Sequence, residues 1–532
     1  MECSNMKTLI FLRLRKPFTD NPDLVFFGFY CITEIPMKLF LIEWSSLVLH
    51  DIARELVRRG SKIAYCTADT QAAGFGDFKK DLSEAKFYDT FDAIRAEGAR
   101  LSDKYRDLVE TLHPYYEETH SMMRRMDYGG VSEDRKKELF SLYVSFWAEA
   151  LEEDQPDAVV FSVMPHMVYD FVLYLVCRAK GVRTIMYETA RINDRVILFD
   201  VIGEGSRGLR DCMRAHDDAA LPPDMQEYYD AQRAAGGADP FYMRDIGKSR
   251  VQRFIPIPQL RTIVVSVFNG TFLKKVIQYL KNTFSSESRL TSLSPGAPSG
   301  IVLKFAIWRF TKMTRRYQKE YESLQQDADL NKQYVYAPLH YQPEKNTSPQ
   351  GGVFVDQIKM VRTLSESLPE GWIIYVKEHP TQWGAYSTHA FQGRWQGYYR
   401  ELARIPHVAL IPAGYSTHKL IARARAVATV TGTAGWEATV RGIAALVFGY
   451  PWYMDCTEIL RVSDSATCDH AFKRIASGFH PDQGGVKRFM ACLDRVSKRG
   501  YVENKYAAIS TVGYADNAKN MAALIAFDLS QS

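Results

Sequence analysis

The sequence predicts an α/β protein built from two doubly wound, Rossmann-like domains, with a helical insertion and a helical bridge. Three observations predict this class. Short apolar runs alternate with helical patterns in two separate stretches of the chain. At 532 residues, the chain is longer than a single domain of about 100–200 residues. Hydrophobic residues make up 46% and charged residues 24%, as in globular proteins and unlike disordered or fibrous ones.

The first stretch opens near Met37 with a strand, a helix and a second strand, and a βαβ pattern follows at 158–187. Between them, residues 78–155 are charged, have leucines at helical spacing and contain no strand-like run, so we expect a helical insertion. Residues 1–36 are either an extension or genuine extra strands. The expected strands are Lys38–Glu43, Lys62–Thr67, Ala158–Val163, Thr184–Glu188 and Val196–Ile202.

Residues 205–330 lose the strand rhythm and are expected to bridge the domains. Two basic amphipathic helices, near 271–284 and 301–324, flank a Ser/Pro/Gly-rich loop at 285–300. Eleven Lys and Arg residues face only two acids between Arg261 and Glu320. Basic helices with aromatic residues suit an anionic membrane surface. The alternative is that these helices pack between the domains with their charges in solvent.

The strand–helix alternation then restarts, which predicts a second parallel sheet. Its expected strands are Gln333–Leu339, Trp372–Lys377, Val408–Ile411, Ala426–Val430 and Ala444–Phe448, with helices near 354–368, 394–404, 416–424 and 434–441. Residues 485–530 are expected to be helical. The expected domains are therefore 37–330 and 331–500, followed by C-terminal helices at 501–532.

The eight cysteines are widely and irregularly spaced and form no CxxC pair. This pattern suggests neither a zinc site nor a disulfide framework, and it fits a reducing cytoplasm. The most apolar stretch, Val25 to Leu49, is interrupted by charges and a proline, so we expect no spanning helix. The start lacks the basic, apolar and small-residue pattern of a signal peptide. A cytoplasmic protein is expected.

Polar residues follow every expected strand of the second domain. In open α/β sheets, ligands bind beyond the carboxyl ends of the strands. Five polar groups at one edge therefore predict a binding cleft. The groups are 340–344, 377–380, 414–417, 431–437 and 449–452.

Within this edge, the stretch 429–438 (TVTGTAGWEA) leads from a buried strand through a Gly/Thr turn into a helix. Backbone N–H groups and the helix dipole at such a turn suit a phosphate. Thr431 and Thr433 add hydroxyl donors, and Glu437 can reach a ribose hydroxyl. The alternative is an ordinary turn with Thr433 as the N-cap. The stretch is neither a P-loop nor GxGxxG, which gives ATP hydrolysis and NAD binding little support.

Four other residues of this domain are candidates. Lys377 and His379 could meet phosphate or carboxylate oxygens, although a histidine in such a loop is often structural. Glu344 could act as a base or nucleophile in glycosyl chemistry. Asp356 is a second catalytic candidate, whose alternative is to cap the next helix.

In the first domain, His166 and Glu188 each follow a strand, and Arg191 comes soon after, together with Asn193 and Arg195. We expect this group to bind an acceptor across the cleft, the alternative being ordinary surface residues. The DxD-like run at 327–329 lies at a helix end with no partner histidine, so no metal site is expected.

Together these motifs resemble the capsular polysaccharide biosynthesis family, which includes bacterial β-Kdo transferases. The resemblance covers about 335–455 well and the first domain only in outline. It implies a metal-independent glycosyltransferase of GT-B fold, with the donor nucleotide in the second domain and the acceptor in the first. The motifs are LHYQPE (339–344), GGVFVDQ (351–357), YVKEHP (375–380), Ser416–Thr417 and TGTAGWEA (431–438).

The resemblance also implies residue roles. In Kdo transferases, the Lys-x-His-Pro and Gly/Thr motifs hold the CMP phosphate, which here implies Lys377, His379, Gly432 and Thr433. A carboxylate shortly after a Gln is the proposed nucleophile of retaining members. Here Glu344 follows Gln342 closely, whereas the family spaces its Gln further from an Asp. The full set expected to bind the donor is Gln342, Lys377, Ser416, Thr431, Gly432, Thr433, Gly435 and Glu437.

The expected function is transfer of a sugar from a nucleotide donor to a growing surface polysaccharide, with no separate cofactor. A CMP-linked donor such as CMP-Kdo is favoured, and UDP-sugars and CMP-sialic acid remain open. The expected partners are the nucleotide sugar, a glycan or lipid-linked acceptor and an anionic membrane surface at 261–320, which would place the protein on the inner face of the plasma membrane. Nucleic acid is not expected, because no reader motif is present. The alternatives are a nucleotide-sugar epimerase or hydrolase, and a non-catalytic scaffold of capsule assembly or export.

Overall fold

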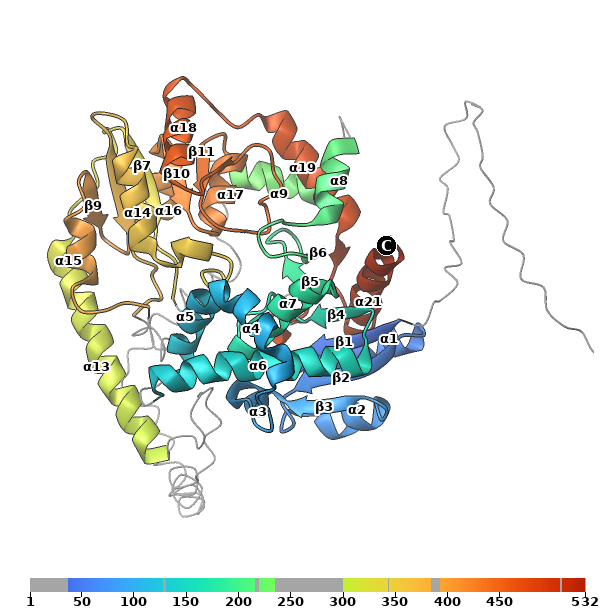
Figure 1. Ribbon diagram of the computed structural model, residues 1–532. Coiled ribbons are helices and arrows are strands. Elements are labelled where there is room, and N and C mark those ends of the chain that lie inside the picture. Colours follow the sequence, from blue (N-terminus) through green and yellow to red (C-terminus); the bar gives the residue numbers. More distant parts are fainter. Residues whose placement is uncertain are drawn as a thin grey trace, which may run out of the picture. The chain divides into compact units, whose positions relative to one another are not determined.

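The computed structural model describes residues 37–127, 131–215, 220–234, 300–342, 344–383, 393–507 and 510–531. Residues 1–35 form a separate unit from 36–532, and all that follows concerns the second unit. The predictions for 1–36, for the helix near 271–284 and for the loop at 285–300 lie outside the described residues. The described chain forms two sheets flanked by helices (Figure 1). The predicted α/β class with two Rossmann-like halves is confirmed.

The first sheet has seven strands in the order β13-β6-β5-β4-β1-β2-β3. Strands β1 to β5 pair in parallel, whereas β6 is antiparallel to β5 and β13 is antiparallel to β6. The strands are β1 (Lys38–Ile42), β2 (Lys62–Ala68), β3 (Lys86–Asp89), β4 (Ala158–Phe161), β5 (Arg183–Thr189), β6 (Arg195–Phe199) and β13 (Lys498–Arg499).

Helices cover both faces of this sheet, which explains why side chains on both faces of β1 and β4 are buried. In β1, Leu39 and Leu41 belong to one buried cluster, and Phe40 and Ile42 belong to another. The helices of this half are α1 (Leu47–Arg58), α2 (Phe75–Asp81), α3 (Thr90–Arg95), α4 (Arg106–Leu112), α5 (Tyr116–Met126), α6 (Glu133–Asp154) and α7 (Val168–Lys180).

The predicted insertion at 78–155 is largely helical, through α3 to α6. The expectation that it contains no strand is wrong, because β3 lies within it and pairs with β2. This strand has four residues at the sheet edge, and none of them is fully buried. A short, half-exposed edge strand has no apolar run by which a sequence pattern could find it.

The second sheet has six strands, all paired in parallel, in the order β12-β11-β10-β7-β8-β9. The strands are β7 (Tyr334–Pro338), β8 (Ile373–Lys377), β9 (Val408–Ile411), β10 (Ala426–Thr429), β11 (Ala444–Val447) and β12 (Leu460–Arg461). The helices between them are a short 3-10 helix (Gly352–Val355), α14 (Gln357–Glu366), α15 (Tyr398–Ala403), α16 (Thr417–Arg423), α17 (Thr433–Val440) and α18 (Ser465–Ala476).

The last part of the chain returns to the first sheet. It comprises α19 (Gln483–Val496), β13, α20 (Asn504–Ala507) and α21 (Tyr514–Ser530). Helix α21 packs beside α1 (Figure 1). Tyr187 of β5 donates a hydrogen bond to the carbonyl of Met521 at 2.9 Å, and Arg183 forms an ion pair with Asp528 at 2.6 Å. Strand β13 and helix α21 therefore belong to the same half of the protein as β1 to β6.

The bridge contains α8 (Arg207–Ala215), α9 (Pro223–Arg233) and α13 (Gly300–Leu324). Helix α8 packs on α19, and a disulfide joins Cys212 to Cys492. The cysteine spacing suggested no disulfide framework, and the structure nevertheless forms this disulfide. The two residues are 280 positions apart, so no local spacing could have shown the pair. Because disulfides are rare in a reducing cytoplasm, the cysteines do not support that location.

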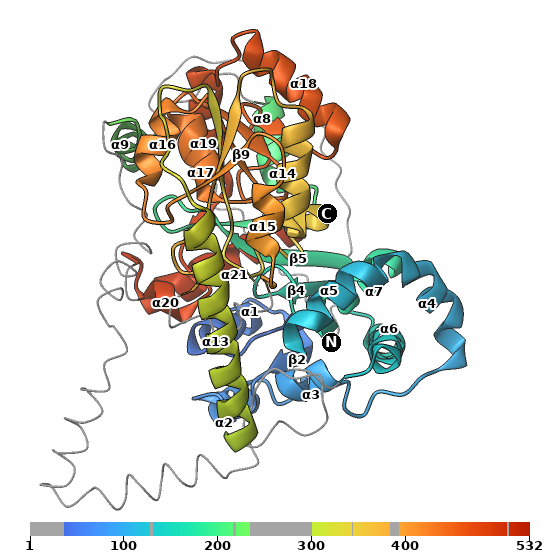
Figure 2. The ribbon, with the colours of Figure 1, turned by 90° about the vertical axis from the view of Figure 1, so that its left-hand side faces the viewer.

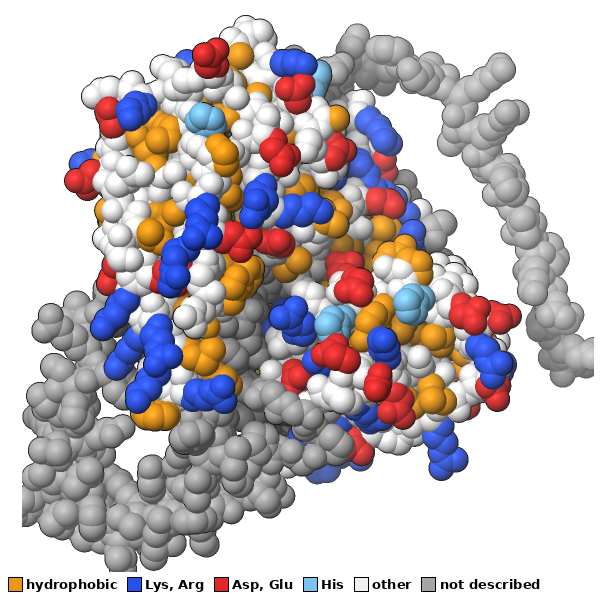
Figure 3. Space-filling model, turned by 60° about the vertical axis from the view of Figure 1, so that its left-hand side comes forward, with side chains coloured by type: hydrophobic (Ala, Val, Ile, Leu, Met, Phe, Trp, Pro, Cys, Tyr) orange, Lys and Arg blue, Asp and Glu red, His pale blue; other side chains and the backbone are white. Residues whose placement is uncertain are grey.

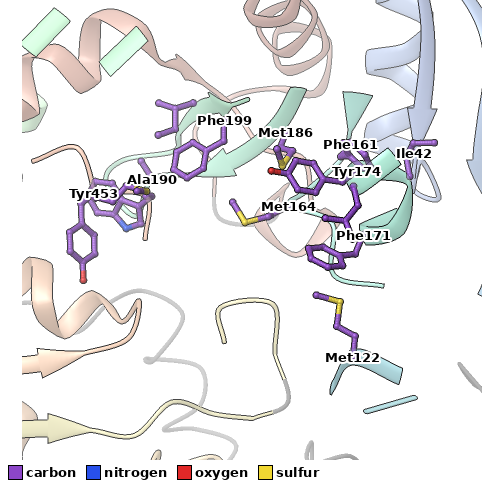
Figure 4. Close-up of a cluster of buried hydrophobic side chains, with 14 of the residues drawn as sticks. Ile42, Met122, Phe161, Met164, Phe171, Tyr174, Met186, Ala190, Phe199 and Tyr453 are labelled. Atoms are coloured by element: carbon purple, nitrogen blue, oxygen red, sulfur yellow. The ribbon is translucent and has the colours of Figure 1, made fainter. Parts of the chain in front are cut away.

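Buried apolar side chains connect the two halves. One cluster runs from Phe161, Met186 and Phe199 of the first sheet to Tyr453 of the second half (Figure 4). Ala190, which follows β5, belongs to the same cluster as Tyr453. Among the described helices, none is both long and apolar enough to cross a membrane.

Candidate functional site

The second sheet has its topological switch point between β7 and β10. From β7 the chain proceeds to β8 and β9 on one side, and from β10 it proceeds to β11 and β12 on the other. In open α/β sheets, the crevice for a ligand forms outside the carboxyl ends of the strands at such a point. The residues that follow these two strands, from His340 and from Val430 onward, therefore occupy the position where a ligand is expected.

His340 ties these two strand ends together. Its Nε2 atom accepts hydrogen bonds from the amides of Val430 and Thr431, both at 3.1 Å. A nitrogen that accepts two N–H groups carries no proton, so the imidazole is neutral. Burial lowers the pKa of His340 to about 3, and the nearby charges of His379 and Arg394 act in the same direction. The strand-end pattern predicted the position of His340 but no function for it.

The Gly/Thr turn is closely packed around that imidazole. Gly432 is the N-cap of α17 and brings no side-chain cap, so the alternative of an ordinary turn capped by Thr433 is wrong. A Cβ at Gly432 would lie 2.7 Å from Thr429 Oγ1 and 2.9 Å from His340 Cε1, so this position requires glycine. The Gly432 amide donates to Thr429 Oγ1 at 3.0 Å, and the Thr431 hydroxyl donates to the Asn346 carbonyl at 2.6 Å. The amides of residues 430–432 thus have acceptors within the protein.

A buried ion pair lies beneath this edge. Arg394 Nε and Nη2 donate to the two carboxylate oxygens of Glu378 at 2.8 and 2.9 Å, and both side chains are almost completely buried. Arg394 Nη1 also donates to Gln342 Oε1 at 2.6 Å, and Nη2 donates to the His340 carbonyl at 3.1 Å. Arg394 therefore fixes the loops after β7 and β8. It follows no strand and sits in no motif, so the sequence did not single it out.

Three residues predicted to bind the donor make protein contacts. Gln342 Nε2 donates to the Val355 carbonyl at 2.7 Å, so both ends of its amide are engaged. Lys377 is buried, and its Nζ donates to Thr417 Oγ1 at 2.6 Å and to the Tyr415 carbonyl at 3.0 Å. Ser416 caps α16 by accepting from the Lys419 amide. These contacts hold the loops around the crevice in place.

His379 is half-buried, and its ring centroid is 6.1 Å from that of Tyr341. Its Nδ1 lies 2.8 Å from the Thr381 hydroxyl. The Thr381 amide also donates to Nδ1, at 3.3 Å. His379 is close enough for its charge to affect the pKa of His340. The structure therefore brings His340, His379 and the Gly/Thr turn to one edge, as the strand-end pattern predicted.

The predicted carboxylates have different environments. Glu344 is exposed, and its Oε2 accepts from Asn346 Nδ2 at 3.0 Å. Asp356 is the N-cap of α14, where Oδ1 accepts from the amides of Ile358 and Lys359. Glu437 is buried in α17, and so is Gly435, where a Cβ would lie 2.6 Å from the Tyr453 hydroxyl oxygen.

Two of the predicted acceptor residues face the second half. Glu188 is buried, with Lys345 Nζ at 3.7 Å and Gln350 Nε2 at 3.4 Å from its Oε2. Burial lowers the pKa of His166 to about 3, and the charges of Arg125 and Lys345 act in the same direction. Lys345 therefore approaches both residues from the loop after β7. Lys345, Gln350 and Arg125 were not predicted. Lys345 and Gln350 come from a loop of the other sheet, and Arg125 comes from α5, so strand-end patterns of the first sheet do not include them.

The arginines beyond β5 face elsewhere. Arg191 donates to the Tyr506 hydroxyl of α20. Arg195 is buried and pairs with Asp224 at 2.8 Å and with Asp494 at 2.5 Å. The expectation that Arg195 reaches across the cleft is therefore wrong. Asp329 of the DxD-like run accepts the Asn331 amide within a turn before β7.

Residues 323–456 match the family model described as capsule polysaccharide biosynthesis protein. No curated protein matches the chain. Three solved structures illustrate its structural neighbours. KpsC, a β-Kdo 2,7 transferase from Thermosulfurimonas dismutans, is 10% identical, with 74% of this chain and 90% of that chain covered and a TM-score of 0.29.

UDP-GlcNAc 2-epimerase from Neisseria meningitidis, bound to UDP-GlcNAc, is 11% identical, with 93% and 100% covered and a TM-score of 0.23. A glycosyltransferase from Rickettsia africae is 7% identical, with 87% and 97% covered and a TM-score of 0.23. Identities and TM-scores this low carry no information about activity. The family match spans all five strand-end motifs of the second sheet. Over residues 323–456 the chain thus matches the capsule polysaccharide biosynthesis family, as those motifs predicted.

Proposed function

We propose that the protein is a glycosyltransferase of capsule or related surface polysaccharide synthesis that uses a nucleotide-sugar donor. The observation that carries this proposal is the position of the family motifs. His340, His379 and the Gly/Thr turn meet at the switch point of the second sheet, within the segment that matches the family. That is the place where open α/β sheets bind their ligands.

The donor phosphate is proposed to lie at the N-terminus of α17, beside His379. The eight-residue helix directs its positive end toward the crevice. Developing negative charge on the leaving phosphate is stabilised there by the helix dipole and the imidazole. Because this charge is met by protein groups, the proposal needs no metal. The resemblance favours a CMP-linked donor over a UDP-linked one.

Gln342, Lys377 and Ser416 then act as positioning residues, because their side chains hold the surrounding loops. Glu344 is favoured over Asp356 as the reacting carboxylate. The Asp356 side chain already accepts two amides of α14, whereas Glu344 is exposed. The acceptor is proposed to approach from the first half, near Glu188 and His166.

In the transfer, an acceptor hydroxyl oxygen forms a bond to the anomeric carbon, and the bond from that carbon to the nucleotide phosphate breaks. The nucleotide leaves with the electron pair. A carboxylate takes the hydroxyl proton. In a retaining enzyme, Glu344 would first form the bond to the anomeric carbon, and the acceptor would replace it in a second step.

The test is a transfer assay with CMP-linked and UDP-linked sugars, each with and without a glycan acceptor. Release of nucleotide that requires acceptor, together with a heavier glycan in mass spectra, is the expected result. Nucleotide release or an epimerised sugar without acceptor would instead favour the hydrolase or epimerase. No conversion of any donor by the folded protein would favour the scaffold.

We also propose that α13 rests on an anionic membrane surface, which places the enzyme on the inner face of the plasma membrane. Its inner side packs on α15 (Figure 2). Its outer side presents cations (Figure 3) and Trp308, which is 52% exposed. Residues 308–319 contain no acid. The cations are Arg309, Lys312, Arg315, Arg316 and Lys319.

Reversing two of these charges, in R315E/R316E, is expected to weaken binding to phosphatidylglycerol vesicles by about 30-fold or more. Each basic side chain near such a surface contributes about 1 kcal/mol. Sedimentation with vesicles measures this. The control K79E/K80E changes net charge equally on α2 and should bind like the wild type. Equal binding by both variants would contradict a membrane role for α13.

A further inference from the structure

A pocket of about 740 Å³ opens between α5 of the first half and the second half. Glu117, Glu118 and Ser121 line it from α5. The 3-10 helix and the ends of β11 and β12, including Tyr450 and Arg461, line it from the other side. Its volume lies in the range of pockets that bind small molecules. None of the residues assigned a role above lies in its lining.

The pocket has a firmly held aromatic wall. The Tyr450 ring lies close to two glycines, one from each half. A Cβ at Gly203 would lie 3.3 Å from the ring, and one at Gly352 would lie 3.4 Å from the hydroxyl oxygen. The Tyr450 amide donates to the Gln350 carbonyl at 2.8 Å. An aromatic face that the backbone fixes in this way is suited to contact a sugar ring.

The same wall adjoins the proposed donor site. Gly449 also lines the pocket, and a Cβ there would lie 2.9 Å from Thr431 Cγ2 and 2.5 Å from the Gln350 carbonyl oxygen. Thr431 belongs to the Gly/Thr turn, and the Gln350 side chain contacts Glu188. Gly449 therefore separates the pocket from the edge where the donor is proposed to bind, and the two are neighbours.

Glu118 is the chemically distinctive group in the pocket. It is half-buried and forms no hydrogen bond or ion pair with any residue that the structure describes. Burial raises the pKa of Glu118 to about 7. The titratable groups around it are Glu117 on its own helix, Tyr174 on α7, and Tyr450 and Arg461 of the second half. A carboxyl group with these properties can accept a proton near neutral pH.

We propose that this pocket binds the terminal sugar of the glycan acceptor, and that Glu118 accepts the proton of the attacking hydroxyl. The inference rests on the proposed transferase function. The nucleotide phosphate departs first, when Glu344 bonds to the anomeric carbon. In the second step the acceptor hydroxyl oxygen bonds to that carbon as its proton passes to the Glu118 carboxylate, and the bond from the carbon to Glu344 breaks. The pocket walls carry carboxylates, hydroxyls and Arg461. These groups can form hydrogen bonds and ion pairs with the hydroxyl and carboxylate groups of polysaccharide sugars. Glu344 then keeps the nucleophile's part.

The test compares E118Q with the wild type in acceptor-dependent transfer across pH 5.5 to 9. The expected loss is about 100-fold or more in kcat/KM for the acceptor, the size typical of a general base. Wild-type kcat/KM should fall below about pH 7, where Glu118 takes up its proton, and E118Q should lack this acidic limb. E110Q, an exposed change on α4, is the control and should match the wild type.

Nucleotide binding, measured by thermal shift, distinguishes a failure of the Glu118 role from a failure of the transferase function. E118Q should keep the wild-type shift, because the donor site is intact. If E118Q binds nucleotide and also transfers sugar at the wild-type rate with the wild-type pH profile, the role of Glu118 is overturned while the transferase stands. If the folded wild type neither binds nucleotide nor transfers sugar, the function fails and the inference fails with it.

Discussion

Replacing Arg394 with methionine is expected to lower the free energy of unfolding by about 3–5 kcal/mol. The substitution leaves the Glu378 carboxylate buried without its cation, and 0% of the Glu378 side chain is exposed. It also removes the hydrogen bonds that Arg394 donates to Gln342 and to the His340 carbonyl. The loops after β7 and β8 should loosen together.

Urea unfolding followed by circular dichroism measures this loss. The matched control is R362M, which breaks an ion pair with Glu401 in which the side chains are 52% and 41% exposed. An exposed pair contributes about 0–1 kcal/mol, so R362M should hardly change the free energy of unfolding. The double variant E378L/R394M should recover part of the loss, since no charge is left buried alone. Equal effects of R394M and R362M would show that the pair is not buried.

Replacing His340 with leucine is expected to cost about 2–5 kcal/mol at pH 7. The amides of Val430 and Thr431 lose their shared acceptor, and each buried amide left without a partner costs about 1–3 kcal/mol. The same change should weaken nucleotide binding, because the Gly/Thr turn loses its support. H470L, a change at an exposed position on α18, is the control.

The cost of this leucine should shrink as the pH falls. The pKa of His340 is lowered to about 3 in the folded state, from about 6.5 in the unfolded chain. Below pH 6.5 the unfolded state gains a proton that the folded state does not, so the histidine's contribution is lost as the pH falls toward 3. Between pH 7 and 5 the difference between wild type and H340L should narrow by about 2 kcal/mol. An unchanged difference would mean that His340 is not held neutral.

The central strands could be predicted because both faces of each parallel sheet are covered by helices. Such strands are apolar throughout and stand out in the sequence, as β4 and β11 do. Strands β12 and β13 have two residues each, and β13 is exposed. They form by pairing with a neighbour and not from an apolar pattern. The disulfide and the return of α21 to α1 depend on contacts between distant parts of the chain, which local patterns do not record.

The edge of the candidate site could also be predicted, because it depends only on which residues follow each strand. What those side chains contact could not. The sequence shows Lys377 as a cation at a strand end, whereas the structure engages its Nζ with Tyr415 and Thr417. In the sequence, Arg394 cannot be distinguished from a surface arginine. Only the structure shows that it pairs with Glu378. The roles of His379 and Glu344 in binding and catalysis stay predictions.

Thermal unfolding in the presence of CMP, UDP, GDP and ADP tests the central claim, that the strand ends of the second sheet bind a nucleotide. A nucleotide at 100 times its Kd should stabilise the folded protein by about 2.7 kcal/mol and raise its Tm by several degrees. We expect CMP to do so, H379A to lose the shift, and the exposed change H470A to keep it. A rise in Tm with UDP alone would support the nucleotide site but indicate a UDP-linked donor in place of a CMP-linked one. A folded wild-type protein whose Tm responds to none of the four nucleotides would contradict the account.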